Sequence, residues 1–333
     1  MAGERTAVFT RSCARYPSIG ETWARFFSVI DPGTDLNTDV APSRGYGLVL
    51  LAGVFWSFGG MIVRQIEAAN EWQILFYRSG ALAATLLVFL AARNRGAVVA
   101  TFRAVGSTGV IAGLCSACTF ITFIFSLTHT TVANALFLAS SAPFMAAVLG
   151  RILLGERVRR SMGVAMIGAL LGIAIMVGEG ETAGGLFGDL MALGTALGFA
   201  GFTVALRRGR TVEMFPAVCL AGVFALIITG AMVIRTGHSF VISAHDLVLC
   251  LLYGGVLVGC GLMMYTRGSR HLPAAELTLL SLIDVVLGPI WVWLGIGEVP
   301  SPMTLLGGGI VLASIVGLAV MGIRKRYPPI GVV

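Results

Sequence analysis

Ten long apolar runs, separated by short polar gaps, dominate the chain from residue 45 onward. At a helical rise of about 1.5 Å per residue, about 20 residues cross the roughly 30 Å hydrocarbon core of a bilayer. A membrane-spanning strand would instead alternate apolar and polar residues over about ten positions. The runs therefore predict ten transmembrane helices, at 46–63, 72–92, 104–127, 131–150, 160–178, 186–206, 214–234, 245–266, 272–294 and 303–323.

The fourth run has a counterpart in the ninth. Segment 129–156, HTTVANALFLASSAPFMAAVLGRILLGE, returns at 271–298 as HLPAAELTLLSLIDVVLGPIWVWLGIGE, at an offset of 142 residues and without a gap. The same offset relates Gly113 to Gly255 in the preceding runs. A fixed internal period of this kind indicates a duplicated unit, which here contains five predicted helices.

Lys and Arg are distributed unevenly between the gaps. With the N-terminus in the cytoplasm, sixteen of them lie in cytoplasmic gaps and at the C-terminal end, whereas only Arg64 and Arg235 lie outside. Cytoplasmic loops carry the excess of positive charge, so both termini are predicted to be cytoplasmic. Because each unit crosses five times, the second unit enters from the opposite side. The predicted fold is an all-α membrane protein with ten transmembrane helices in two inverted five-helix repeats, an architecture of secondary transporters.

The same runs set the domain boundaries. Residues 1–44 are predicted to form a disordered cytoplasmic tail, 45–180 the first repeat, 184–324 the second and 325–333 a cytoplasmic C-terminal tail. The N-terminal tail lacks the apolar stretch and cleavage site of a secretory signal, so the first helix is expected to direct insertion into the cell (inner) membrane. Whether 1–44 belong to the mature protein or reflect an overlong start stays open.

Composition supports a membrane rather than a nucleic-acid partner. The chain is 57% hydrophobic and 12% charged, which leaves too little polar surface for a water-soluble protein of this size. Its net charge of +7 lies mostly in short gaps, where it acts as a topology signal. Six scattered cysteines include Cys115 and Cys118, without a second pair or a histidine cluster. We therefore expect buried thiols, no metal site and no cofactor.

Two ionisable side chains lie deep in the apolar runs: Arg78 in the second and Asp284 in the ninth. Each costs about 2.5 to 3.5 kcal/mol to insert at mid-bilayer, so each should face protein, water or a partner. Helix rise places Arg78 about 9 Å and Asp284 about 12 Å below the outer surface. We hypothesise that they line one central cavity, where Arg78 binds a substrate carboxylate and Asp284 an ammonium group or a proton. A structural ion pair, or separate satisfaction by backbone groups, is the alternative.

Aromatic residues in the runs are further candidates for a substrate cavity. They are Trp56, Tyr77, Phe123, Tyr265, Trp291 and Trp293. The alternative is that they form interfacial belts or pack between helices.

Prolines and polar residues mark other positions within the predicted helices. Pro143 and Pro289 each remove a helix hydrogen bond in mid-run, so they are candidate hinges, with a static kink as the alternative. Asn134 and Glu276 are related by the repeat and lie close to the start of their helices, where a structural or gating role is expected.

Several short motifs make the chain resemble the EamA-type branch of the drug/metabolite transporter superfamily. They are FYR at 76–78, Pro143 followed by LLGE at 153–156, and GIGE at 295–298. With the five-plus-five repeat, the resemblance extends over 45–323. It implies a cavity between the halves, alternating access, and export or exchange of amino acids and other small metabolites.

The ninth helix departs from the family pattern. Members commonly carry an acidic residue followed by proline there, whereas here Val285 follows Asp284 and Pro289 comes one turn later. The position of a hinge therefore does not transfer directly from the resemblance.

The expected function is that of an inner-membrane secondary transporter of a small-molecule substrate, with protons as a candidate coupling ion and lipid as its solvent. The rival classes are an intramembrane enzyme and a channel-like facilitator. An enzyme is disfavoured because the chain has no HExxH motif, and Gly188-Asp189 follows Phe187 without the first glycine of the GxGD pattern. A channel usually has a pore-loop filter rather than an inverted repeat.

Overall fold

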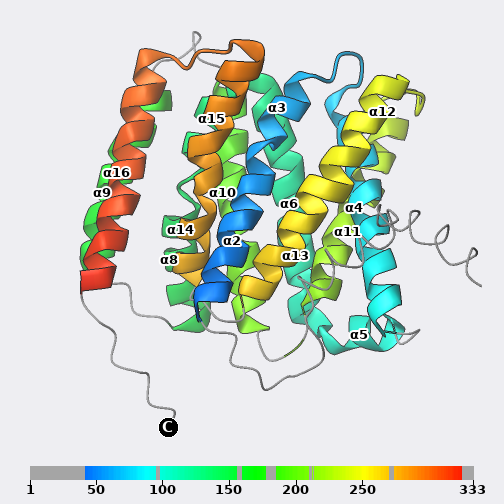
Figure 1. Cartoon of the computed structure of the whole chain (residues 1–333), viewed down its shortest axis with the longest axis horizontal. Helices are drawn as coiled ribbons and strands as arrows, with labels where there is room; N and C mark the ends of the chain where they lie inside the picture. Colours follow the sequence, from blue (N-terminus) through cyan, green and yellow to red (C-terminus); the bar gives the residue numbers. More distant parts are fainter. Residues whose placement is uncertain are drawn as a thin grey trace, which may run out of the picture. The chain divides into compact units, whose positions relative to one another are not determined.

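The computed structural model describes residues 42–94, 98–155, 160–177, 185–209, 212, 214–269 and 274–324, and the regular elements there are all helices (Figure 1). The first half contains α2 (Pro42–Ser57), α3 (Gly59–Arg64), α4 (Glu71–Asn94), α5 (Val98–Ala104), α6 (Gly106–His129), α7 (Val132–Ala139), α8 (Ala142–Leu154) and α9 (Arg160–Val177). The second contains α10 (Leu186–Arg208), α11 (Phe215–Arg235), α12 (Ala244–Leu251), the π-helix η2 (Leu252–Val258), α13 (Gly259–Gly268), α14 (Ala274–Ser281), α15 (Ile283–Ile296) and α16 (Pro302–Arg324). The predicted tails lie almost wholly outside the described residues.

Seven helical stretches of the described chain are long and apolar enough to cross a membrane. They are Gly45–Arg64, Glu71–Ala92, Gly106–His129, Val132–Leu154, Leu186–Arg208, Phe215–Arg235 and Ala244–Gly268. Three shorter apolar helices, Gly163–Ile175, Ile283–Ile296 and Pro302–Ser314, coincide with the remaining predicted runs. Ten crossings in two inverted repeats therefore stay a prediction.

Four of the predicted runs are not uniform α-helices. The first is interrupted at Phe58, and the eighth passes through the π-turns of η2. The fourth and ninth break after Ala139 and Ser281, respectively. An apolar run indicates only the length and the burial of a helix, so the sequence pattern could not predict these interruptions.

The breaks in the fourth and ninth runs follow the sequence repeat. Moving α7 by 142 residues gives the bounds of α14, and the C-termini of α8 and α15 correspond at the same spacing. Both half-helices end at a left-handed glycine, Gly155 with φ 69° and Gly297 with φ 78°. Glycine adopts this conformation without steric cost and so ends both helices in the same way.

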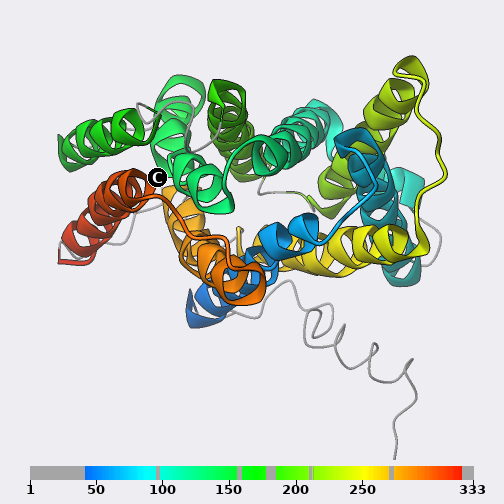
Figure 2. The same cartoon turned by 90° about the horizontal axis from the view of Figure 1, so that it is seen from above.

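Close packing between helices relies on small residues. α10 lies along α6, α11 packs on α4 and α6, and α13 and α15 pack on α2. α9 and α16 form a pair at one edge, as the view along the helices shows (Figure 2). A Cβ added at Gly172 would lie 2.6 Å from the Gly307 carbonyl oxygen, so only glycine permits this approach of α9 and α16.

The outward faces of the helices are apolar. Val88, Ile152 and Ile234 expose about 70% of their surface, with relative values of 69%, 70% and 70%. Continuous apolar exposure of this kind is unfavourable in water and favourable in hydrocarbon. It is the surface expected of helices solvated by lipid.

Candidate functional site

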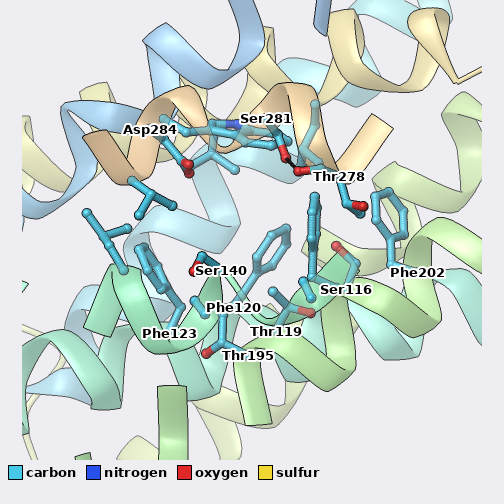
Figure 3. Close-up of a pocket in the computed structure, with 18 of the residues that line it drawn as sticks. Ser116, Thr119, Phe120, Phe123, Ser140, Thr195, Phe202, Thr278, Ser281 and Asp284 are labelled. Atoms are coloured by element: carbon cyan, nitrogen blue, oxygen red, sulfur yellow. Dashed lines mark hydrogen bonds between the residues drawn. The ribbon is translucent and has the colours of Figure 1, made fainter. Parts of the chain in front are cut away.

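A cavity lies among the helices and encloses about 880 Å³ of empty space, part of it open to solvent (Figure 3). Both halves of the chain contribute to its wall. The lining residues are Trp56, Arg78, Ser116, Thr119, Phe120, Phe123, Leu136, Ala139, Ser140, Ala142, Thr195, Phe199, Phe202, Tyr253, Val258, Leu262, Thr278, Ser281, Leu282, Asp284 and Val285.

Both helix breaks lie at this cavity. Ser140, between α7 and α8, and Leu282, between α14 and α15, are lining residues. The half-helices α8 and α15 therefore begin at the cavity wall. A helix N-terminus carries partial positive charge, and half-helices beginning at a mid-membrane site are a recurring feature of transporters.

Arg78 on α4 is a buried cation with unused hydrogen-bonding capacity. Only 2% of its surface is exposed, and Nε and Nη1 have no hydrogen-bond partner among the described residues. Its guanidinium carbon lies 4.6 Å from the centroid of the Phe120 ring and 4.7 Å from that of Tyr253. The aromatic faces stabilise the positive charge but accept no conventional hydrogen bond, so Arg78 can still receive an anion.

Gly254 holds Tyr253 beside Arg78. A Cβ at position 254 would overlap the Arg78 carbonyl oxygen, so η2 reaches α4 only because this residue is glycine. π-turns inside α-helices occur frequently at functional sites. Here the π-turn places the Tyr253 ring against the guanidinium.

Asp284 provides a negative group to the same cavity from the first turn of α15. Its carboxyl group lies beside the backbone N–H groups of Asp284 and Val285 at the start of α15. Within the described part of the chain, no Lys, Arg or His lies within ion-pair distance of it. Arg78 and Asp284 share a cavity without forming an ion pair, so each is able to bind an opposite charge.

Hydroxyl groups extend the acceptor surface of the cavity. Ser281 donates to the Thr278 carbonyl at 2.9 Å, and Thr119 donates to the Cys115 carbonyl at 2.9 Å. Ser140 also donates to the Phe137 carbonyl of α7. Because their hydrogens are used in this way, the cavity-facing hydroxyls mainly offer lone pairs. This favours a ligand that carries N–H or O–H donors.

The structure separates the six predicted aromatic candidates. Trp56 and Phe123 line the cavity. Tyr265 is fully buried behind Trp56, with ring centroids 5.4 Å apart, and its hydroxyl lies 3.0 Å from that of Thr203. Tyr77 is not a lining residue, because its hydroxyl donates to the Phe240 carbonyl between α11 and α12. Trp291 donates to the Ser57 hydroxyl at 3.0 Å and Trp293 is 56% exposed, and neither lines the cavity. Direct substrate contact is thus open to two of the six in this arrangement.

The two candidate hinge prolines take different positions. Pro143 lies at the start of α8, directly after the break, where a missing N–H removes no necessary hydrogen bond. Pro289 lies inside α15, one turn beyond Asp284. Their roles as hinges stay predictions.

The aromatic pair around Arg78 was not identified from the sequence. Phe120 precedes Phe123 by three residues and shares its helix face, a spacing that could have revealed it. Tyr253 had no comparable signal, because its position depends on the π-turn in η2.

Family comparison decides the class of protein. The sequence pattern of the EamA-like transporter family matches residues 43–178 and again residues 186–320. The chain belongs to the EamA-like transporter family. This confirms the resemblance found in the sequence, and both matched segments of the EamA-like chain contribute to the cavity wall.

Individual relatives are transporters as well. The EamA-like chain is 26% identical to the pseudopaline exporter CntI of Pseudomonas aeruginosa over 284 residues, which cover 83% of this chain and 95% of that protein. It is 26% identical to the uncharacterized transporter YwfM of Bacillus subtilis over 220 residues, 65% of this chain and 73% of that one. A protein of known crystal structure aligns with a TM-score of 0.61 at 19% identity, covering 86% of this chain and 99% of that chain, which shows a shared fold.

These findings make the EamA-like chain a multi-pass membrane transporter of a small molecule, not an enzyme. The prediction against an intramembrane enzyme is confirmed by its family. In the described residues, no group of His, Cys, Asp and Glu side chains could hold a metal ion.

Proposed function

We propose that this protein is an inner-membrane secondary transporter that exports or exchanges amino acids or related small metabolites by alternating access. The proposal rests on one observation. The same cavity contains Arg78, a buried cation with unused hydrogen-bond donors, and Asp284, a carboxylate that forms no ion pair with the described residues. Amino acids carry the two complementary charges on a small framework. Proteins of this kind place such sites between two inverted halves near the membrane midplane.

In the proposed binding mode, Arg78 receives the substrate carboxylate. The Phe120 and Tyr253 rings hold the guanidinium in place, which lowers the entropy lost on binding. Hydrogen bonds between ionised partners are stronger than neutral ones and are further favoured by the apolar surroundings.

The substrate ammonium binds Asp284 in the same mode. Lone pairs of Ser140 and Ser281 complete its surroundings, and Trp56 and Phe123 contact the apolar part of the molecule. When no ammonium is present, Asp284 is the candidate residue for binding a proton, so substrate and proton would compete for it.

Alternating access requires the two halves to move relative to each other around the cavity. The helix breaks at Ser140 and Leu282 are natural points of bending, since the helix is already interrupted there. Pro143 and Pro289 are the candidate hinge residues next to them. Ten crossings with both termini in the cytoplasm complete the proposed architecture.

The direction of net transport is proposed from a relative. CntI of Pseudomonas aeruginosa is named as an exporter and aligns over most of both chains. At 26% identity its substrate does not transfer, so the substrate class here is based on the two charges of the cavity.

Counterflow in proteoliposomes tests the proposal. Purified protein is reconstituted in liposomes loaded with one unlabelled amino acid at a time, and entry of the labelled amino acid is followed at equal pH on both sides. We expect saturable entry that depends on the internal amino acid. Linear entry independent of internal substrate would indicate a channel-like facilitator, and no entry with any amino acid would refute the proposed substrate class.

A further inference from the structure

A second buried polar cluster lies outside the cavity, where the end of α6 and the start of α7 meet the first turn of α10. It contains Asp189, Asn134 and Thr130, which are 3%, 1% and 5% exposed. None of the three lines the cavity. Since Asp189 belongs to the second half and the others to the first, the cluster joins the two halves.

The hydrogen bonds of this cluster converge on Asp189. The Asn134 amide nitrogen and the Thr130 hydroxyl both donate to Asp189 Oδ1, the hydroxyl at 3.4 Å. The Asn134 nitrogen also donates to the Thr130 hydroxyl oxygen at 3.1 Å. The carboxylate is thus held by neutral donors, and within the described chain no cation forms an ion pair with it.

Ionisable side chains near the cluster have other partners. From α6, the His129 ring packs on Phe187, and its Nδ1 lies 2.9 Å from the Phe125 carbonyl oxygen. From α3, Arg64 donates to the Thr130 carbonyl at 2.8 Å and pairs with Glu298 at 2.8 Å.

The other helices packed on α10 bring little charge. α7 has no ionisable residue, α8 has only Arg151 near its C-terminus, and α14 has Glu276, whose side chain lies outside the described residues. Asp189 therefore has no described countercharge from the helices around it.

One atom of the cluster lacks a partner. The Asn134 side-chain oxygen is buried and accepts no hydrogen bond from the described residues. An ionised carboxylate only accepts hydrogen bonds, so it satisfies the amide nitrogen and leaves the amide oxygen alone. A protonated carboxyl both donates and accepts, so a small rotation would let it pair with both amide atoms. Binding one proton forms one O–H bond and satisfies the unpaired oxygen.

We propose that Asp189, with Asn134 and Thr130, is a proton-binding site separate from the substrate cavity and coupled to the opening of this end of the transporter. The coupling follows from the surroundings of the α6–α7 turn. Arg64 binds the Thr130 carbonyl, and Glu298 accepts the Val132 N–H at 2.7 Å, so this turn joins α3, α10 and the segment after α15. A change of charge at Asp189 therefore alters the interactions at the point where these elements meet.

The first test measures proton binding directly. Infrared difference spectra of the purified full-length protein, recorded as pH is lowered, should contain a carboxyl carbonyl band that is absent in Asp189→Asn. Asp246→Asn is the matched control, because Asp246 is equally buried but accepts hydrogen bonds from three backbone N–H groups at residues 67–69. The band should persist in this control. A spectrum unchanged by Asp189→Asn would overturn the proposal.

A second variant tests the acid–amide pair and does not alter Asp189. In Asn134→Leu the carboxyl keeps its proton site but loses the amide, so its carbonyl band should move to higher frequency, as for a carboxyl with fewer hydrogen bonds. An unmoved band would exclude the pairing with Asn134. This variant also provides the test if Asp189→Asn does not fold.

The transport test rests on the proposed function. In proteoliposomes, Asp189→Asn should keep counterflow at equal pH within about two-fold, because Asp189 does not touch the cavity. Accumulation of substrate driven by a pH gradient should fall at least ten-fold in this variant. Accumulation at the wild-type level would refute coupling. Absence of counterflow in the wild type would instead refute the proposed function, and the infrared result would still decide the proton site.

Discussion

The two halves of the molecule share a backbone plan but not a chemistry. α7–α8 and α14–α15 break and end at positions 142 residues apart. Directly after the break, the first half has Ala142 and the second has Asp284, and both line the cavity. Likewise, Arg78 corresponds at this spacing to Leu220 in the second half. Duplication therefore accounts for the matching helix breaks at the site, and later substitutions for the one positive and one negative group among its described lining residues.

The third helix of each half extends this comparison. α6 in the first half is one α-helix, whereas its counterpart consists of α12, η2 and α13. Gly254 in η2 corresponds to Ala112 in α6, which is buried without overlap. Among the described third helices, the π-turn that brings the Tyr253 ring to Arg78 thus belongs to the second half.

Gly254→Ala is expected to have the largest effect. The added methyl group overlaps the Arg78 backbone rather than a movable side chain, so α4 and η2 must separate. Overpacking typically costs about 1 to 3 kcal/mol, and contact with a fixed backbone belongs at the upper end. Thermal unfolding in detergent should show a clearly lower Tm and less folded protein.

Ala112→Gly is the matched control for Gly254→Ala. It removes a methyl group at the corresponding position of α6 and should cost only about 1 kcal/mol. Equal losses of stability in the two variants would contradict the structural difference between the third helices.

Arg78→Gln should have the next largest effect, on binding. It removes the only buried cation described at the cavity, and a hydrogen bond to a charged group is worth about 1.5 to 3 kcal/mol. Half-saturation of counterflow should therefore rise about ten- to 100-fold for substrates with a carboxylate. Amino acid amides, which lack that charge, are the control substrates and should be affected much less. A similar loss for acids and amides would indicate a structural role for Arg78.

Asp284→Asn should weaken binding by about ten-fold, because the amide still accepts hydrogen bonds but no longer attracts an ammonium group. Ser281→Ala, at a neighbouring lining position, is the control and should remain within about three-fold of the wild type. The discriminating measurement compares an amino acid with its deaminated analogue. If Asp284→Asn affects both equally, the ammonium is not bound there.

Hydropathy and charge predicted an all-helical membrane protein and a common cavity for Arg78 and Asp284. The cost of burying a charge requires each to have a polar environment, and similar depths bring both to one cavity. Local backbone geometry could not be predicted in this way. Tyr77 is adjacent to Arg78 but points to the α11–α12 connection, because successive residues on a helix face different directions.

The buried cluster outside the cavity also escaped prediction. Asp189 lies in a first helical turn, where an acidic residue is ordinary, so only its burial and its contact with Asn134 distinguish it. Asn134 was predicted to have a structural or gating role from its place near the start of a helix and its repeat relation to Glu276. Its unpaired oxygen depends on a tertiary contact between the halves, which no local sequence pattern encodes.

Glu298→Gln should have the smallest effect and tests the end of the molecule where Arg64 and Glu298 meet the α6–α7 turn. Glu298 binds Arg64 and the Val132 N–H but is partly exposed, so the ion pair contributes about 0.5 to 1 kcal/mol. Glutamine keeps an oxygen for the N–H and removes the charge, which should shift the population modestly toward the state open at this end. Labelling of a cysteine introduced at Leu136, a cavity-lining position on α7, should become about two- to four-fold faster with an impermeant reagent added from that side. An unchanged rate would mean that the charge of Glu298 stabilises the fold without controlling access at this end.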